Sequence, residues 1–211
     1  MKTVLITGFE PFGGEKINPS QEIAQRLNGR VILGRTVVGR VLPCVFGAAN
    51  TKLRRLLRQT CPELAIGVGQ AGGRAEITPE RVAINVDDAR IADNVGNRPV
   101  DAPIAARGPA AYWSSLPIKA IVIALRARGI PAAVSQTAGT FVCNHVFYGL
   151  MHALHRTRGV RGGFIHVPFL PEQTKTQPSL PLETMIEAIA LAIKTSLQHR
   201  QDTRRSDGQT H

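Results

Sequence analysis

Short apolar runs that end at glycine or proline alternate with amphipathic stretches along this chain. Residues 2–9 form a nearly continuous apolar run, which is typical of a strand buried on both faces in a parallel sheet. Asn18 then provides an N-cap, Pro19 a first helical residue and Gln21 a capping-box side chain, and residues 28–29 (Asn-Gly) end the helix. The chain therefore starts with a strand, a loop and a helix.

The same alternation continues to the end of the chain, apart from one irregular stretch between residues 69 and 117. Further strands are predicted at 37–42, 64–68, 132–135 and 163–167, and helices at 46–59, 117–128, 141–155 and 182–199. This order predicts an α/β fold with a mostly parallel sheet in a single domain, residues 1–199. Residues 200–211 are polar, and we expect them to form a disordered tail.

Composition narrows the class of protein. The chain has 211 residues, of which 43% are hydrophobic, and no apolar run approaches the ~18 residues of a membrane-spanning helix. Its three cysteines are few and far apart, which fits neither a disulfide framework nor a zinc cluster. We expect a soluble cytoplasmic protein with reduced thiols and with no membrane partner, metal or cofactor.

The charge raises the possibility of a nucleic-acid partner. The formal net charge is +11, but the excess is spread along the chain and only 5% of the residues are aromatic. Proteins that bind single-stranded nucleic acid combine a basic groove with aromatic stacking platforms, which this composition does not supply. We therefore expect a solvated basic surface and no nucleic-acid partner.

The loop after the first strand, residues 8–14 (G-F-E-P-F-G-G), is rich in glycine and precedes a helix. It lacks the lysine and hydroxyl of a phosphate-binding loop, and Glu10 would repel a phosphate. Phe9 and Phe12 can instead form an apolar wall of a binding site, or can simply anchor the loop to the core.

Cys143 is the strongest candidate for a reactive residue. In the segment 135–144 (S-Q-T-A-G-T-F-V-C-N) a strand ends and the cysteine arrives in the first turn of the next helix. The free N–H groups and the dipole of a helix N-terminus favour thiolate over thiol and can also receive an oxyanion. The alternative is an inert structural cysteine.

A cysteine nucleophile needs a base, and His166 lies at the end of a predicted strand on the same edge of the sheet. A third group should orient the imidazole, and Glu80 is the preferred candidate, with Asp87 and Asp88 as rivals. Glu80 can alternatively form an ordinary salt bridge with Arg74 or Arg81.

Several long motifs resemble those of the pyroglutamyl-peptidase I family, also called pyrrolidone-carboxylate peptidases. They are the glutamate motif at 69–85 (G-Q-A-G-G-R-A-E-I-T-P-E-R-V-A-I-N) and the cysteine motif at 135–144, together with 7–14, 85–94 and 164–171. The similarity extends from about residue 2 to residue 199.

This resemblance implies a three-layer sandwich in which a twisted, mostly parallel sheet has helices on both faces. It implies a cysteine exopeptidase, an omega-peptidase that removes N-terminal pyroglutamate from peptides through a thioester, with Glu80, Cys143 and His166 as the catalytic triad. It also implies oxyanion support from Arg90, a cytoplasmic homotetramer, and substrate-binding residues Phe9, Phe12, Gln70, Ile91, Phe141 and Val142.

Two other functional hypotheses remain open: a non-enzymatic binder of anions or nucleic acid, and a phosphate-dependent phosphorylase that uses the glycine loop. Both leave Cys143, His166 and Glu80 without a role. The peptidase reading is therefore preferred.

Overall fold

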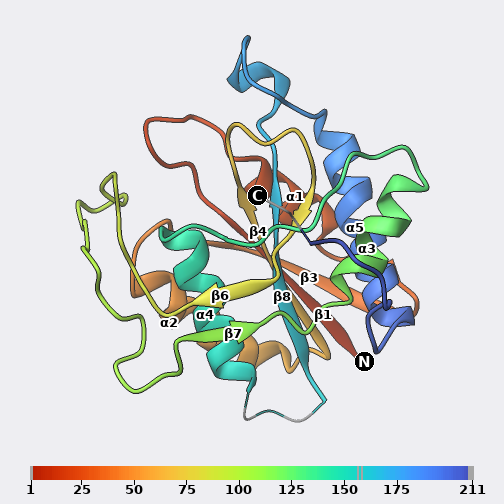
Figure 1. Ribbon diagram of the computed structural model, residues 1–211, viewed down its shortest axis with the longest axis horizontal. Coiled ribbons are helices and arrows are strands. Elements are labelled where there is room, and N and C mark those ends of the chain that lie inside the picture. The colour runs from red at the N-terminus through yellow and green to blue at the C-terminus, as the bar shows by residue number, and fades with distance from the viewer. Residues whose placement is uncertain (1, 156, 158, 209–211) are drawn as a thin grey trace.

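A computed structural model describes residues 2–155, 157 and 159–208, and its centre is a six-stranded sheet (Figure 1). The strand order is β2-β3-β1-β4-β8-β5. The four inner strands run parallel: β1 (Thr3–Phe9), β3 (Arg35–Leu42), β4 (Leu64–Gln70) and β8 (Arg161–Val167). The short edge strands β2 (Val31–Ile32) and β5 (Thr78–Pro79) are antiparallel to their neighbours. The prediction of a mostly parallel sheet is confirmed.

Helices cover both faces of this sheet (Figure 1). One face packs against α1 (Pro19–Leu27), α3 (Ile118–Arg126) and α5 (Leu182–Gln198), and the other against α2 (Ala48–Thr60) and α4 (Val142–Leu154). The three-layer α/β sandwich expected from the sequence is therefore confirmed.

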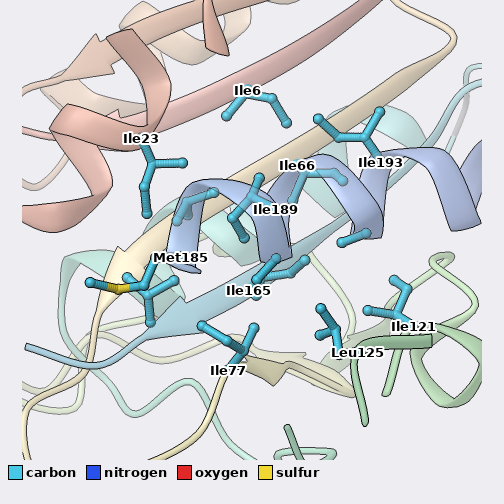
Figure 2. Packing of buried hydrophobic residues seen from close by; sticks show 14 of the residues in the cluster. Ile6, Ile23, Ile66, Ile77, Ile121, Leu125, Ile165, Met185, Ile189 and Ile193 are labelled. Carbon is cyan, nitrogen blue, oxygen red and sulfur yellow. The ribbon is translucent and has the colours of Figure 1, made fainter. Parts of the chain in front are cut away.

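Alternation along each inner strand decides which side chains belong to which layer. Ile6, Ile66 and Ile165 lie in the apolar core shared with α1, α3 and α5 (Figure 2). Their strand neighbours Leu5 and Phe164 belong to the core on the α2 and α4 side. Since successive strand residues point to opposite faces, His166 lies on the same side as Phe164, facing α4.

Local signals start the first helix at the predicted residues, but the capping box predicted at Gln21 does not form: Gln21 Oε1 is buried and accepts no hydrogen bond from the described residues. The Asn18 side chain accepts a hydrogen bond from the Ser20 backbone N–H at 3.0 Å, and Pro19 occupies the first helical position. The helix ends at Leu27, before the Asn28-Gly29 pair. Helix capping by Asn and helix initiation by proline depend on adjacent residues only, which is why sequence alone predicts them.

The strand predicted at residues 132–135 is wrong. This segment makes only isolated parallel bridges, Ile77 to Ala132 and Glu80 to Ser135. The two bridges flank Pro79, which has no N–H to donate and so interrupts the ladder. Two short strands, β6 (Val82–Ile84) and β7 (Ala111–Trp113), form a separate small sheet, and a single 3-10 turn, η1 (Pro171–Gln173), follows β8.

The described part of the C-terminal tail, residues 200–208, has neither helix nor strand but contacts the domain. The Asp202 carboxylate accepts hydrogen bonds from the backbone N–H groups of Lys119 and Ala120, at 3.1 and 3.0 Å, at the start of α3. Pro117, the N-cap of that helix, makes no such side-chain bond. Asp202 therefore caps α3 from a distant part of the chain. The rest of the predicted tail, residues 209–211, lies outside the described residues.

Of the helices in the described part of the chain, none is long and apolar enough to cross a membrane.

Candidate active site

Cys143 is the second residue of α4 and lies in its first turn. The N-cap residue is Phe141, whose side chain makes no capping hydrogen bond. The first backbone N–H groups of α4 are therefore not occupied by a side-chain cap and can receive a negatively charged atom. This is the placement that the sequence predicts for a nucleophilic cysteine.

The Cys143 sulfur lies close to the central strands β4 and β8. A Cβ atom added at Gly69 of β4 would stand 2.8 Å from Cys143 Sγ, so the absence of a side chain at Gly69 makes room for the thiol. Gly69 is also the register partner of His166 on β8. The helix start and the strand end thus bring the cysteine and the histidine to one place.

His166 is held by Glu80. The His166 Nδ1 atom lies 2.7 Å from Glu80 Oε1, and both side chains are almost fully buried, with 3% and 0% of their residue surfaces exposed. An ionised carboxylate can only accept, so Nδ1 carries the proton and donates it to Glu80. The neutral imidazole therefore keeps Nε2 unprotonated, in the state of a general base.

Glu80 also forms the salt bridge that the sequence offered as its alternative role. Arg74 Nη1 donates to the same Oε1 atom at 2.8 Å. The second carboxylate oxygen, Oε2, is buried and receives no hydrogen bond from the described residues. One oxygen of Glu80 thus serves both the histidine and the arginine.

The rivals of Glu80 have other partners. The Asp87 carboxylate lies 2.7 Å from Nδ1 of His145, whose Nε2 atom accepts a hydrogen bond from the Gly47 backbone N–H at 2.9 Å. Asp88 lies on the wall of the cavity described below, and its backbone carbonyl accepts a bond from Thr140 Oγ1 at 2.7 Å. Among the described residues, Glu80 is the carboxylate that contacts His166.

A cavity of about 370 Å³ opens at Cys143 and His166. The predicted site residues on its wall are Phe12, Gln70, Arg90, Ile91 and Phe141, and the sequence did not single out Ala71, Gly72, Ala138, Gly139 or Thr140, which also line it. Sites for small ligands are commonly such mostly apolar hollows with a few polar groups. The cavity can therefore hold a compact apolar group directly beside the thiol.

Two predicted pocket residues lie elsewhere. Phe9 and Val142 are 2% and 0% exposed in the apolar core, and the Phe9 ring packs 6.2 Å from the Phe164 ring. Phe46, which the sequence did not single out, packs edge-on against Phe141 with 5.4 Å between ring centres. No local pattern marked Phe46, because its contact is with a helix start far away in the sequence.

The surroundings of Cys143 favour the thiol form. Burial raises the pKa of this thiol, and the nearby Cys44 and Glu80 act in the same direction, while Arg74 opposes them. The helix N-terminus was expected to favour the thiolate, so two opposing effects act on the sulfur. With a raised pKa, Cys143 would need a base to remove its proton before it could act as a nucleophile.

The other cysteines have different settings. Cys44 is buried, and burial together with Glu10 and Asp93 raises its pKa to about 12. Cys61 lies on a separate cavity of about 390 Å³, on a wall that contains no histidine and no carboxylate among the described residues. Across all the residues that the structure describes, no group of three or more His, Cys, Asp or Glu side chains is arranged to hold a metal ion.

The close approach of Gly69 to the sulfur gives a testable expectation. We expect Gly69→Ala to lower kcat/KM by tenfold or more, because the new Cβ would displace Cys143 Sγ and lie 2.9 Å from the Phe164 ring. Gly67→Ala is the matched control, since its Cβ would meet the same ring at 2.5 Å but not the sulfur. Rates should be compared per folded molecule, with the folded fraction measured by circular dichroism. Equal losses in both variants would contradict this expectation.

Comparison with known proteins identifies relatives over the whole chain. The model of the pyroglutamyl peptidase family matches residues 2–199. Curated pyrrolidone-carboxylate peptidases from Cupriavidus pinatubonensis and Klebsiella pneumoniae are 62% and 57% identical, each over all of both chains.

Solved structures agree with this result. The pyroglutamyl peptidase I of Bacillus amyloliquefaciens superposes with a TM-score of 0.95 at 51% identity, covering 97% of this chain and 99% of that one. The pyrrolidone carboxyl peptidase of Thermococcus litoralis gives a TM-score of 0.95 at 42% identity, covering 98% and 100%. From the matching family model and from relatives at this level of identity, the chain belongs to the pyroglutamyl peptidase family and is a hydrolase of that cysteine-peptidase class.

Proposed function

We propose that the chain removes an N-terminal pyroglutamyl residue from peptides, with Cys143 as nucleophile, His166 as general acid and base, and Glu80 as the group that orients His166. The observation that carries this proposal is the arrangement around His166. Its Nδ1 atom is bound to buried Glu80, and the side chain lines the same cavity as Cys143. A base that is oriented by a carboxylate and placed beside a thiol is the arrangement of a cysteine peptidase.

The proposed reaction has two stages. His166 Nε2 takes the Cys143 proton as Sγ attacks the carbonyl carbon that joins pyroglutamate to the next residue, and a C–S bond forms. His166 then gives this proton to the leaving amine as the C–N bond breaks, which leaves a thioester. Next, His166 takes a proton from water and the hydroxide oxygen bonds to the thioester carbon. The C–S bond then breaks, His166 returns its proton to Sγ, and pyroglutamate is released.

Negative charge develops on the carbonyl oxygen in both stages. The uncapped backbone N–H groups at the start of α4 lie next to Cys143 and can donate to this oxygen. Arg90 lines the same cavity and would support the oxyanion as a cation. Glu80 stabilises the imidazolium that forms when His166 holds the thiol proton.

The cavity wall favours an uncharged ring as the bound group. Phe12 and Phe141 face one another with 5.8 Å between their ring centres, and Ile91 completes the apolar side. Gln70 offers polar contacts to the lactam, and its side-chain oxygen accepts a bond from Gln173 Nε2 at 2.9 Å, which fixes its orientation. A free N-terminal glutamate would bring two charges against this apolar side and lose their hydration, and the site should reject it.

We also propose that residues 1–199 form the catalytic domain and that the protein acts as a homotetramer in the cytoplasm. This proposal rests on the resemblance of the motifs to the family. Light scattering coupled to size-exclusion chromatography should then give four times the chain mass of 22.8 kDa.

The direct test is release of a fluorophore from a pyroglutamyl amide. We expect cleavage of this amide, and no comparable cleavage of the matched prolyl amide, which has the same ring without its carbonyl, or of the glutamyl amide. The thiol reagent iodoacetamide should stop the reaction, and a non-hydrolysable pyroglutamyl ligand should slow that inactivation. Equal cleavage of the prolyl and pyroglutamyl amides would rule out lactam recognition.

A further inference from the structure

We infer that Arg74 is a positioning residue of this site: it holds the buried Glu80 carboxylate in place beside His166 and supplies its cationic partner. This inference rests on the proposed function of the triad. Arg74 does not have to touch the substrate for this role; it acts through Glu80.

The contacts of Arg74 support a positioning role. Its Nη1 atom donates to Glu80 Oε1 at 2.8 Å and to Thr78 Oγ1 at 2.7 Å, and its Nη2 atom donates to the Thr137 carbonyl at 3.0 Å. Thr137 lies in the segment that leads to Cys143. One guanidinium thus binds the β5 edge strand, the Glu80 carboxylate and the segment that leads to Cys143. Its planar fork of N–H groups can make these hydrogen bonds at the same time.

The burial of Glu80 makes a cationic partner necessary. The Glu80 side chain is 0% exposed, whereas that of Arg74 is 29% exposed. A buried carboxylate is expensive unless it is paired, and an isolated one takes up a proton instead. The ion pairs of Glu80 among the described residues are with Arg74 and His166. His166 must be neutral when it acts as a base, so in that state Arg74 supplies the positive charge.

Arg74 also acts on the nucleophile. Burial, Cys44 and Glu80 raise the pKa of Cys143, and Arg74 is the neighbouring group that lowers it. Asp88 and Arg90, on the irregular segment that packs over the cavity, are the other charged groups facing this space, and their charges are opposite. Removal of Arg74 therefore takes away the charge that lowers the pKa of Cys143, and it leaves the buried Glu80 carboxylate without a cationic partner while His166 is neutral.

The test compares Arg74→Gln, Arg74→Lys and a matched control, Arg81→Gln. Arg81 follows Glu80 directly, and its Nε atom donates to Gln136 Oε1 at 2.7 Å, next to the residue that Arg74 binds. Its charge and its contact with the 135–140 segment are thus similar, but it makes no hydrogen bond to the Glu80 carboxylate among the described residues. Two profiles are measured against pH: kcat/KM on the pyroglutamyl amide, and the rate of Cys143 alkylation by iodoacetamide, followed by peptide mass spectrometry.

For Arg74→Gln we expect the acid limb of kcat/KM and the inflection of alkylation to move up by about one pH unit. We also expect a loss of about ten- to a hundredfold, mainly in kcat. Arg74→Lys should keep both pH profiles near those of the wild type, because the charge remains, but with a reduced kcat, because an ammonium cannot reproduce the forked contacts. Arg81→Gln should leave both profiles in place.

Unmoved profiles in Arg74→Gln, or an equal shift in Arg81→Gln, would overturn the inference. If Arg74→Gln does not fold, the kcat of Arg74→Lys tests the inference. A wild-type kcat in Arg74→Lys would show that the geometry of the guanidinium is irrelevant and would overturn the inference. Failure of the proposed function gives a different result: the wild-type chain would not cleave the pyroglutamyl amide, while the alkylation profile of Cys143 would still shift in Arg74→Gln.

Discussion

Replacing Cys143 with alanine should lower turnover of a pyroglutamyl amide by at least about 10⁴-fold, because the residual reaction has no nucleophile. The side chain is small and lines the cavity, so the variant should fold with the wild-type circular dichroism spectrum. The double variant Cys143→Ala/His166→Ala should be hardly slower than Cys143→Ala alone. The two residues act as one unit, so their effects do not add.

The other thiols provide the controls. Cys61→Ala should leave turnover unchanged, because Cys61 is exposed and lies on a different cavity. Cys44→Ala should keep most of the activity, because this thiol is buried and its pKa is raised to about 12. Substantial turnover in a Cys143→Ala preparation verified by mass spectrometry would end the thiol mechanism.

Replacing Glu80 with glutamine should lower kcat by about 10²–10⁴-fold with a smaller change in KM. The glutamine amide can present an NH₂ group to His166 and so favour the wrong tautomer, and it carries no charge to stabilise the imidazolium. The variant also leaves the Arg74 guanidinium without its carboxylate partner. Steady-state kinetics combined with a thermal denaturation curve separate the chemical loss from any loss of stability.

Asp87→Asn is the matched control for this change. Asp87 is also a buried carboxylate bound to a histidine at 2.7 Å, but that histidine is His145, which does not line the cavity. We expect Asp87→Asn to lower the melting temperature and to leave kcat close to the wild-type value. If Asp87→Asn lost most of its kcat while Glu80→Gln kept a wild-type kcat, the third member of the triad would have to be reassigned.

The sequence by itself determined the parts of the protein that depend on neighbouring residues. Apolar runs predicted β1, β4 and β8 correctly, because a strand that is buried on both faces carries apolar side chains on both faces. Asn18 and Pro19 gave the start of α1, because capping is local. The placement of Cys143 in the first turn of α4 followed from the end of one periodic pattern and the start of the next.

Only the tertiary structure decided which distant groups meet. The segment 132–135 has the composition of a strand, but its neighbour contains Pro79, so a ladder does not form. The sequence left Phe9 either as a wall of the binding site or as a core anchor, and packing of its ring against Phe164 buries it in the core. Asp202, in a stretch with no apolar residues, reaches back to cap α3.

The choice among Glu80, Asp87 and Asp88 was also a tertiary decision. All three are carboxylates on the segment that follows β4, and nothing in their local patterns says which histidine each one meets. The pairing of β5 with β8 brings Glu80 to His166. The packing of residue 87 against α4 instead places the Asp87 carboxylate beside His145. Local periodicity determines elements, whereas hydrogen-bond partners depend on how those elements pack, which is a property of the whole chain.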